Sequence, residues 1–413
     1  MLTVAKFGGS SLADGDGFAA VKHILRKDPS RRGVVVSAPG RRSRNDSKVT
    51  DLLYLCHDLR ENGGDWERVF DRIAERFLEI AAFCGVKGVE AELESLRRQV
   101  AAGVSRDYLA SRGEYFSARI MAEYLGWKFV DAASWLFFGK DGRVDTVRSY
   151  GQLWRLADRP FVTPGFYGTA ADGGIRTFTR GGSDITGALA AAALEAGLYE
   201  NWTDVPGILQ ADPRQIPEAK SVRHMTYGEL ADLSKVGTQV LHEGTVRPVR
   251  EAEIPLHIRS TWDLEDPGTL ILPSLPDGVT RPSVLSLACR RNRVLVSVTC
   301  GLLELGDAKP DFSVFLLDRQ TVAVPEGFLE QILENQTRGR VEAKDGMALV
   351  AVVFAREAAL GPGAAELLAA LRDRKIPVEA ILRDFGGHTL ILAVPDDRCD
   401  EALQVLWETG KTQ

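Results

Sequence analysis

The first 260 or so residues alternate short apolar runs with longer amphipathic segments. Runs with the length of buried strands cover residues 2–7, 33–37, 128–131, 160–163 and 254–259. Apolar residues recur at helical spacing over residues 50–61, 66–84 and 89–101. Strands that alternate with helices are typical of an α/β sandwich. The three consecutive helices predict a lobe that covers a ligand.

The pattern changes after a stretch rich in proline and glycine at 263–283. Beyond it, short segments follow one another in the order β, α, β, β, α. We therefore expect an N-terminal domain over 1–262 and a linker over 263–283. Two small α+β units should follow, over 290–345 and 346–413, with 284–289 as an added strand of the second.

One glycine-rich loop stands where a turn opens into a helix. Gly181 and Gly182 lie between Arg180 and Asp184, and an alanine-rich run follows. Free N–H groups at a helix start attract anions, and side chains of both signs favour a zwitterionic or metal-bound ligand. The simpler alternative is an ordinary glycine turn before a buried helix, because short glycine motifs often occur by chance.

A second loop of this kind follows the first strand. Lys6 ends the apolar run, and Gly8 and Gly9 come directly after it. A lysine at the end of a buried strand is costly unless it meets a negative group, which glycines allow the backbone to approach. Lys6 is therefore a candidate for contact with a phosphoryl group, although a lysine that reaches solvent from an edge strand is the alternative.

Two further motifs carry polar groups. Thr203 and Asp204 follow the strand-like run 198–202, and ligands of open α/β sheets bind at the carboxyl ends of strands. Ser111 and Glu114 precede the helical run 115–125. Serine followed by glutamate three positions later is a capping box, and on this pattern alone we expect a helix cap here.

Four motifs together resemble those of aspartate kinases, within the amino acid kinase superfamily. They are Lys6-Phe-Gly-Gly-Ser-Ser, Ser111-Arg-Gly-Glu, Thr179-Arg-Gly-Gly-Ser-Asp and Thr203-Asp-Val-Pro-Gly, the last continuing to Ala211-Asp-Pro-Arg. The resemblance implies an amino-acid-kinase αβα sandwich followed by two ACT-like units. It also implies phosphorylation of the side-chain carboxylate of aspartate by ATP and Mg²⁺, which yields 4-phospho-L-aspartate. Such a carboxylate is already ionised at neutral pH, so no base is needed to activate it.

The resemblance also assigns roles to residues. Lys6, Arg180 and Asp184 would be catalytic, with Arg180 on the substrate α-carboxylate and Asp184 and Glu114 on its ammonium group. The aspartate pocket would further include Ser37, Thr50 and Ser183. The ATP side would comprise Lys6, Gly8, Gly9, Ser10, Gly181, Gly182, Thr203, Asp204 and Arg214. No metal site made by the protein is expected, because Mg²⁺ would be held by ATP oxygens and water.

Composition and charge exclude several classes of protein. The net charge of −6, with both signs interspersed, gives no basic footprint for nucleic acid. No apolar stretch has membrane-spanning length, and residues 1–7 do not form a signal peptide. The five cysteines are odd in number and scattered, which favours reduced thiols and a cytoplasmic enzyme.

Two alternatives stay open on the sequence. One is a related kinase for another amino acid or carboxylate, and the other is a non-catalytic amino-acid-binding regulator. The second is disfavoured because a binding protein has no need of Lys6.

The tail departs from the family pattern. Residues 301–306 and Pro310 replace the helix expected after the first strand of the first ACT-like unit. We expect the tail to keep a role in forming a homodimer, with weakened or lost sensitivity to lysine or threonine.

Overall fold

The computed structural model describes residues 1–179, 181–236, 241, 243–299, 301–305, 307–308, 310–316, 319–336, 339–356, 360–383 and 388–411. The chain forms two compact units. Unit 1 comprises Met1–Ile208 and Leu241–Leu275, and unit 2 comprises Leu209–Val240 and Pro276–Gln413. Residues 209–240 therefore group with the C-terminal segment. The boundaries predicted from the sequence assign these residues to the first domain instead, and those boundaries stay a prediction.

Unit 1 is built on a largely parallel sheet, in which strands follow the order β3-β4-β2-β1-β7-β9-β10. The strands are β1 (Thr3–Phe7), β2 (Arg31–Val36), β3 (Lys128–Phe129), β4 (Phe161–Pro164), β7 (Leu198–Thr203), β9 (Leu256–Ser260) and β10 (Thr269–Leu272). A hairpin of β5 (Tyr167–Thr169) and β6 (Ile175–Thr177) stands apart. Adjacent β1 and β7 run parallel, which brings Lys6 level with Asn201.

Helices cover both faces of this sheet. They are α1 (Gly15–Lys27), α2 (Val49–Glu61), α3 (Trp66–Cys84), α4 (Val89–Ala102), α5 (Arg106–Leu125), α6 (Thr146–Leu156), α7 (Gly182–Ala193) and α9 (Glu243–Glu251). Ala5 and Phe7 pack into one core with α1–α5. Because successive side chains of a strand point to opposite faces, Lys6 faces the other side, where α7 packs on β1. The expected α/β sandwich is confirmed.

The expectation of a helix cap at Ser111 is wrong. Helix α5 begins at Arg106, and its N-cap is Ser105, whose side chain accepts a hydrogen bond from the Tyr108 backbone N–H. Ser111 lies in the middle of the helix and donates to the Tyr108 carbonyl over 2.6 Å. Glu114 is therefore free of any capping role.

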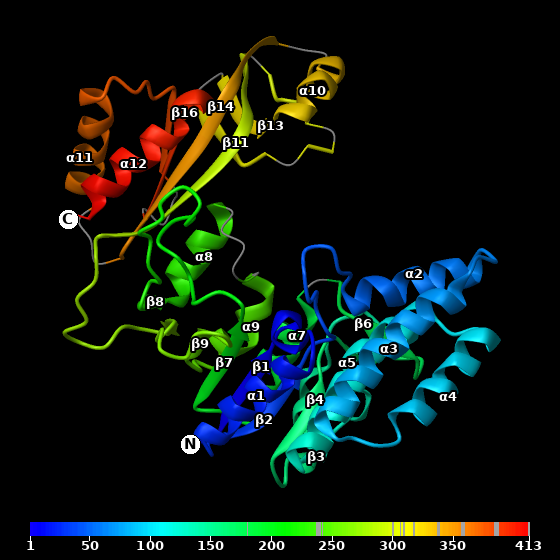
Figure 1. Cartoon of the computed structure of the whole chain (residues 1–413). Helices are drawn as coiled ribbons and strands as arrows, with labels where there is room; N and C mark the ends of the chain where they lie inside the picture. The colour runs from blue at the N-terminus through cyan, green and yellow to red at the C-terminus, as the bar shows by residue number, and fades with distance from the viewer. Residues whose placement is uncertain are drawn as a thin grey trace. The chain divides into compact units, whose positions relative to one another are not determined.

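Unit 2 contains an antiparallel sheet in the order β12-β13-β11-β14-β16-β15. Its strands are β11 (Val284–Thr299), β12 (Phe312–Leu316), β13 (Arg319–Pro325), β14 (Arg340–Phe354), β15 (Ala380–Arg383) and β16 (Thr389–Pro395). The two central strands, β11 and β14, run through both small units that the sequence predicts (Figure 1). β11 and β14 pair along most of their length, and the second half of β11 also pairs with β13.

Two separate cores flank these long strands. Helices α11 (Leu360–Asp373) and α12 (Cys399–Gly410) pack with β14 and β16 around Val350 and Leu392. These helices and strands form the second lobe. Helix α10 (Leu329–Asn335) packs on β11 and β13 around Ile332 in the first lobe. No helix lies among the described residues between β11 and β12. The shortened form of the first unit stays a prediction.

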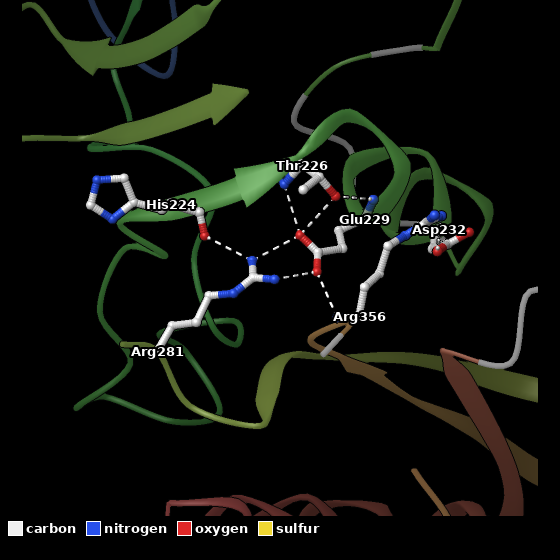
Figure 2. A network of polar contacts seen from close by, with 6 residues as sticks. All are labelled: His224, Thr226, Glu229, Asp232, Arg281 and Arg356. Carbon is white, nitrogen blue, oxygen red and sulfur yellow. Dashed lines mark hydrogen bonds and ion pairs between the residues drawn. The ribbon is translucent and has the colours of Figure 1, made fainter. Parts of the chain in front are cut away.

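Helix α8 (Tyr227–Val236) follows the short strand β8 (His224–Thr226) and belongs to unit 2. The Glu229 carboxylate accepts hydrogen bonds from the Thr226 backbone and hydroxyl, over 2.7 and 3.0 Å. It also accepts two from the Arg281 guanidinium, over 2.6 and 2.8 Å, and one from the Arg356 backbone, over 2.8 Å (Figure 2). This fully satisfied buried cluster ties α8 to the end of β14.

Candidate active site

The centre of the candidate site is the ammonium group of Lys6 at the carboxyl end of β1. Its Nζ lies 2.6 Å from Oδ1 of Asp184, in the first turn of α7, and 3.3 Å from Oδ1 of Asn201 on β7. Asn201 Nδ2 donates to the same Asp184 oxygen over 2.9 Å. Lys6 is almost buried, but this triad gives its charge a partner, which a buried cation requires. Sequence reasoning gave Asn201 no role, although its place beside Lys6 follows from the parallel register.

A glycine loop after β1 approaches a second loop after β2. The Gly40 N–H donates to the Gly9 carbonyl over 2.8 Å. A Cβ atom on Gly9 would lie 2.9 Å from the Ala38 carbonyl oxygen, so only glycine allows this approach. Gly8 N–H donates to the Trp202 carbonyl over 3.0 Å, which ties the loop to the end of β7. Ser10 follows in the same loop.

Helix α7 opens on glycines. Gly181 is its N-cap, in the left-handed conformation at φ 59°, and makes no side-chain capping bond. A Cβ on Gly182 would meet Phe166 at 2.6 Å. The first N–H groups of a helix have no partner within it, so this start can bind an anion. Ser183 is buried in this turn. Arg180, the third predicted catalytic residue, lies outside the described residues.

Glu114 is a buried carboxylate on α5 with spare bonding capacity. Its Oε2 has no hydrogen-bond partner among the described residues. Burial raises the pKa of Glu114 to about 8, against a hydrogen bond from the Ala38 backbone and the charge of Arg112. Gly113 lets α5 press on the Ala38 loop, because a Cβ there would come within 2.7 Å of Ala38 Cβ. Glu114 therefore lies beside the loop that contacts Gly9.

The loop between β2 and α2 carries the other predicted pocket residues. Ser37 donates its backbone N–H to the Phe7 carbonyl over 3.1 Å, directly after Lys6. Thr50 lies in the first turn of α2 and is partly exposed. Ser37 therefore lies next to the end of β1, and Thr50 follows on the helix that this loop leads into.

Arg76 on α3, which sequence reasoning missed, holds this loop in place. It is buried, and its Nη1 donates to the Gly40 carbonyl over 3.0 Å and to the Ala13 carbonyl over 3.3 Å. Its Nη2 pairs with Asp46. One guanidinium thus connects the segments that follow β1 and β2. On a helix with several arginines, no sequence signal distinguishes the buried one.

The predicted nucleotide residues divide between the units. Thr203 ends β7 and donates its hydroxyl to the Asp204 carboxylate over 3.1 Å. Arg214 belongs to unit 2, where its exposed side chain pairs with Asp212. In the described part of the chain, no cluster of three or more His, Cys, Asp or Glu side chains could hold a metal ion. No helix in that part is long and apolar enough to span a membrane.

Comparisons with known proteins agree with this geometry. The model of the amino acid kinase family matches residues 1–260. Aspartokinase 3 of Bacillus subtilis (strain 168) is 28% identical, and the match covers 98% of each chain. The structure of an aspartate kinase from Clostridium acetobutylicum is similar with a TM-score of 0.91 and 33% identity, covering 99% of this chain and 100% of that one.

A structure of E. coli aspartokinase III, in complex with aspartate and ADP, is similar with a TM-score of 0.74 and 25% identity. It covers 99% of each chain. The full-length matches extend the likeness beyond the catalytic domain to the two-lobed sheet of unit 2. The chain therefore belongs to the amino acid kinase family and, within it, to the aspartate kinases.

Proposed function

We propose that unit 1 transfers the γ-phosphoryl group of ATP to the side-chain carboxylate of L-aspartate, with Lys6 as the group that stabilises the transferring phosphoryl. The observation that carries this proposal is the position of the Lys6 ammonium. It lies between the glycine loop after β1 and the glycine start of α7, where Asp184 holds it at 2.6 Å. A cation fixed between two anion-binding loops suits phosphoryl transfer, which depends on positioning and charge neutralisation.

The acceptor needs no general base. The side-chain carboxylate of aspartate has an unperturbed pKa near 4 and attacks as an anion at neutral pH. The protein has only to neutralise the repulsion between this anion and the phosphates and to hold the two in line. Lys6 and the free N–H groups at the start of α7 supply the positive potential. The product is the mixed anhydride 4-phospho-L-aspartate.

The residues fit a magnesium nucleotide. Backbone groups of Gly8, Gly9, Ser10, Gly181 and Gly182 would approach the phosphates, and Thr203 and Asp204 would contact the rest of the nucleotide. Mg²⁺, when bound, neutralises phosphate charge, and it characteristically takes most of its ligands from phosphate oxygens and water. The complex of E. coli aspartokinase III with aspartate and ADP supports use of ATP here.

Aspartate itself would be recognised through both charged ends of its backbone. Arg180 would bind the α-carboxylate as a two-pronged donor. Glu114 would accept the ammonium group, because its carboxylate is buried with one oxygen unpartnered. Asp184 already accepts from Lys6 through Oδ1, which leaves Oδ2 for the substrate ammonium. The remaining pocket residues would be Ser37, Thr50 and Ser183.

An ATP-dependent hydroxamate assay tests this function, since hydroxylamine traps acyl phosphates. We expect product with aspartate and far less with glutamate. Lys6→Ala should lower kcat by about 10²- to 10³-fold, the usual effect of removing one group that stabilises a transition state. Lys128→Ala is the matched control, because Lys128 is also a strand lysine of unit 1 but pairs with exposed Asp158.

Two outcomes would contradict the proposal. Hydroxamate from glutamate or another acid, with none from aspartate, would reassign the substrate. A Lys6→Ala enzyme as active as Lys128→Ala would remove Lys6 from the chemistry.

The two-lobed sheet of unit 2 supports a homodimer formed through this unit. Sedimentation at several protein concentrations tests it, and a monomer throughout would refute it. The absence of a helix among the described residues between β11 and β12 supports weak feedback control. Lysine and threonine, added singly and together, should therefore inhibit weakly. Strong inhibition below millimolar concentration would overturn that expectation.

A further inference from the structure

Two cysteines that are 110 positions apart in sequence meet in unit 2. The Sγ atoms of Cys289 and Cys399 lie 2.7 Å from each other. Cys289 is on the central strand β11, and Cys399 is the first residue of α12, the helix that packs on this strand. Cys399 is fully buried in the core of the second lobe, whereas Cys289 is partly exposed at its margin.

The geometry already approaches that of a bonded pair. A disulfide bond is about 2.05 Å long, so the two sulfurs need to close by only roughly 0.7 Å. Both residues belong to regular elements that share one core, so no loop has to refold to bring them together. Three or more metal ligands do not gather here, because the described residues contain no such cluster. The two cysteines are therefore arranged as a pair of thiols and not as part of a metal site.

The surroundings distinguish the two thiols. Arg291, two residues from Cys289, donates to the Asp396 carbonyl over 3.1 Å and pairs with Asp400, so its charge lies at the start of α12. The hydrogen bond with Cys399 lowers the pKa of Cys289, and Arg291 lowers it further, against the effect of burial. The same hydrogen bond, together with burial, raises the pKa of Cys399. Cys289 is thus the more exposed and more readily ionised sulfur.

The thiols of the other described cysteines, Cys56 and Cys84, are harder to ionise. Burial raises the pKa of Cys56 to about 11 and that of Cys84 to about 12. Cys56 Sγ donates to the Trp66 carbonyl over 3.7 Å, not to another thiol. Thiolate character and exposure control cysteine reactivity. These two cysteines are therefore suitable internal controls.

We propose that Cys289 and Cys399 form a reversible redox site, which a small disulfide of the glutathione type oxidises to an intramolecular disulfide. The Cys289 thiolate attacks one sulfur of the small disulfide, whose S–S bond breaks, and one thiolate leaves. Cys399 then loses its proton to that thiolate, and its sulfur attacks Cys289 Sγ and expels the second thiolate. Overall the protein loses two hydrogens, and the small disulfide becomes two thiols.

This bond would link β11 to α12 across a long segment of chain. A cross-link that closes a long loop restricts the unfolded state most strongly, so oxidation should stabilise the second lobe. Thermal unfolding of the oxidised protein should shift upward by roughly 5–10 °C relative to the reduced protein. An unchanged or lower midpoint in the oxidised protein would show that the bond does not stabilise this lobe.

The decisive measurement uses the full-length wild-type protein. The protein is equilibrated with reduced and oxidised glutathione at graded ratios, quenched in acid, alkylated, and analysed by intact mass and peptide mapping. We expect a loss of about 2 Da, for two hydrogens, a peptide that links Cys289 to Cys399, and full reversal with dithiothreitol. A folded protein with no such link at the highest proportion of oxidised glutathione would overturn the proposal, as would a link between other cysteines.

Single variants test the order of the two steps. Cys399→Ser should retain one glutathione on Cys289, because the second attack is abolished. Cys289→Ser should take up glutathione on Cys399 at least tenfold more slowly. Equal or reversed rates would refute the assigned roles. Cys56→Ser and Cys84→Ser should both form the link as the wild type does. If a variant fails to fold, the wild-type mapping still decides whether the site exists.

Discussion

Glu114 in unit 1 and Glu229 in unit 2 each follow a hydroxyl residue by three positions and are each buried. Thr226 and Glu229 form a true capping box at the start of α8, in which Glu229 N–H donates to the threonine hydroxyl over 3.3 Å and the carboxylate accepts in return. Ser111 and Glu114 lie in mid-helix and make no such exchange.

The pKa values of the two carboxylates shift in opposite directions. Burial alone would raise the pKa of Glu229, but hydrogen bonds from Arg281 and from the Thr226 and Arg356 backbone outweigh it and leave the pKa below its usual value. Glu114 has fewer partners, and its pKa rises to about 8. The partners of Glu229 stabilise its charge within the fold, whereas we propose that the unpartnered oxygen of Glu114 binds a ligand.

The largest expected effect follows from breaking the saturated cluster. Glu229→Gln removes the buried carboxylate that pairs with the Arg281 guanidinium, which should lower the free energy of unfolding by about 3–5 kcal/mol. Urea unfolding of the full chain measures this loss, and hydrogen exchange should locate it in α8. The double variant Glu229→Gln/Arg281→Met should recover part of it.

Glu218→Gln is the matched control, because Glu218 pairs with Lys411 at the surface of the same unit. If both glutamine variants lose equal stability, the Glu229 cluster has no special structural role.

The same substitution at Glu114 should affect substrate binding instead. Glu114→Gln removes no hydrogen-bond partner from Oε2, so the stability of the fold should change little or increase. The KM for aspartate should rise about 10- to 100-fold, the range for losing a hydrogen bond to a charged group. Steady-state kinetics with saturating ATP measure it. Glu123→Gln, on the exposed face of α5, is the control and should leave KM unchanged.

The raised pKa of Glu114 predicts that aspartate binding releases a proton. At pH 7 a carboxyl with a pKa of about 8 is roughly nine-tenths protonated, and an ammonium group that binds it expels this proton. Calorimetric titration in buffers of different ionisation enthalpy should detect nearly one proton for the wild type and none for Glu114→Gln. Equal release by both proteins would exclude Glu114 as the acceptor.

Stability should depend on pH with opposite signs at the two glutamates. Between pH 4.5 and about 8, folded Glu114 keeps a proton that the unfolded chain loses, so its contribution to stability falls as pH rises. Glu229 has a lowered pKa, so its contribution is complete above about pH 4.5 and is lost as pH falls through the folded value. Urea unfolding curves of Glu114→Gln and Glu229→Gln, measured at several pH values, should separate the contributions of the two glutamates to the free energy of unfolding.

The smallest effect is expected from Arg76, which contacts loops rather than the proposed ligands. Arg76→Met frees the Gly40 and Ala13 carbonyls, so kcat/KM should fall about tenfold through looser positioning. Arg76→Lys should restore part of the loss, and separate KM values for ATP and aspartate should show which ligand the loops position. Arg72→Met, on the exposed side of α3, should have wild-type kinetics.

The sequence alone predicted much of this protein, because its signals are local. Apolar periodicity fixed the bounds of α3 at Trp66–Cys84 and placed β1 and β2 within two residues. The order of four short motifs sufficed for the family. Glycine pairs and a strand-end lysine carry such information because their chemistry depends on their immediate neighbours in the chain.

The tertiary structure decided whatever depends on contacts between distant segments. Only the fold shows that β11 and β14 each continue through two lobes, that Asn201 joins Lys6 and Asp184, and that Cys289 meets Cys399. It also distinguishes Glu229, which caps a helix, from Glu114, which lies in mid-helix with one oxygen unpartnered among the described residues. Burial and hydrogen bonding set the charge state of both carboxylates, and these are properties of the packed chain that a local pattern of residues does not contain.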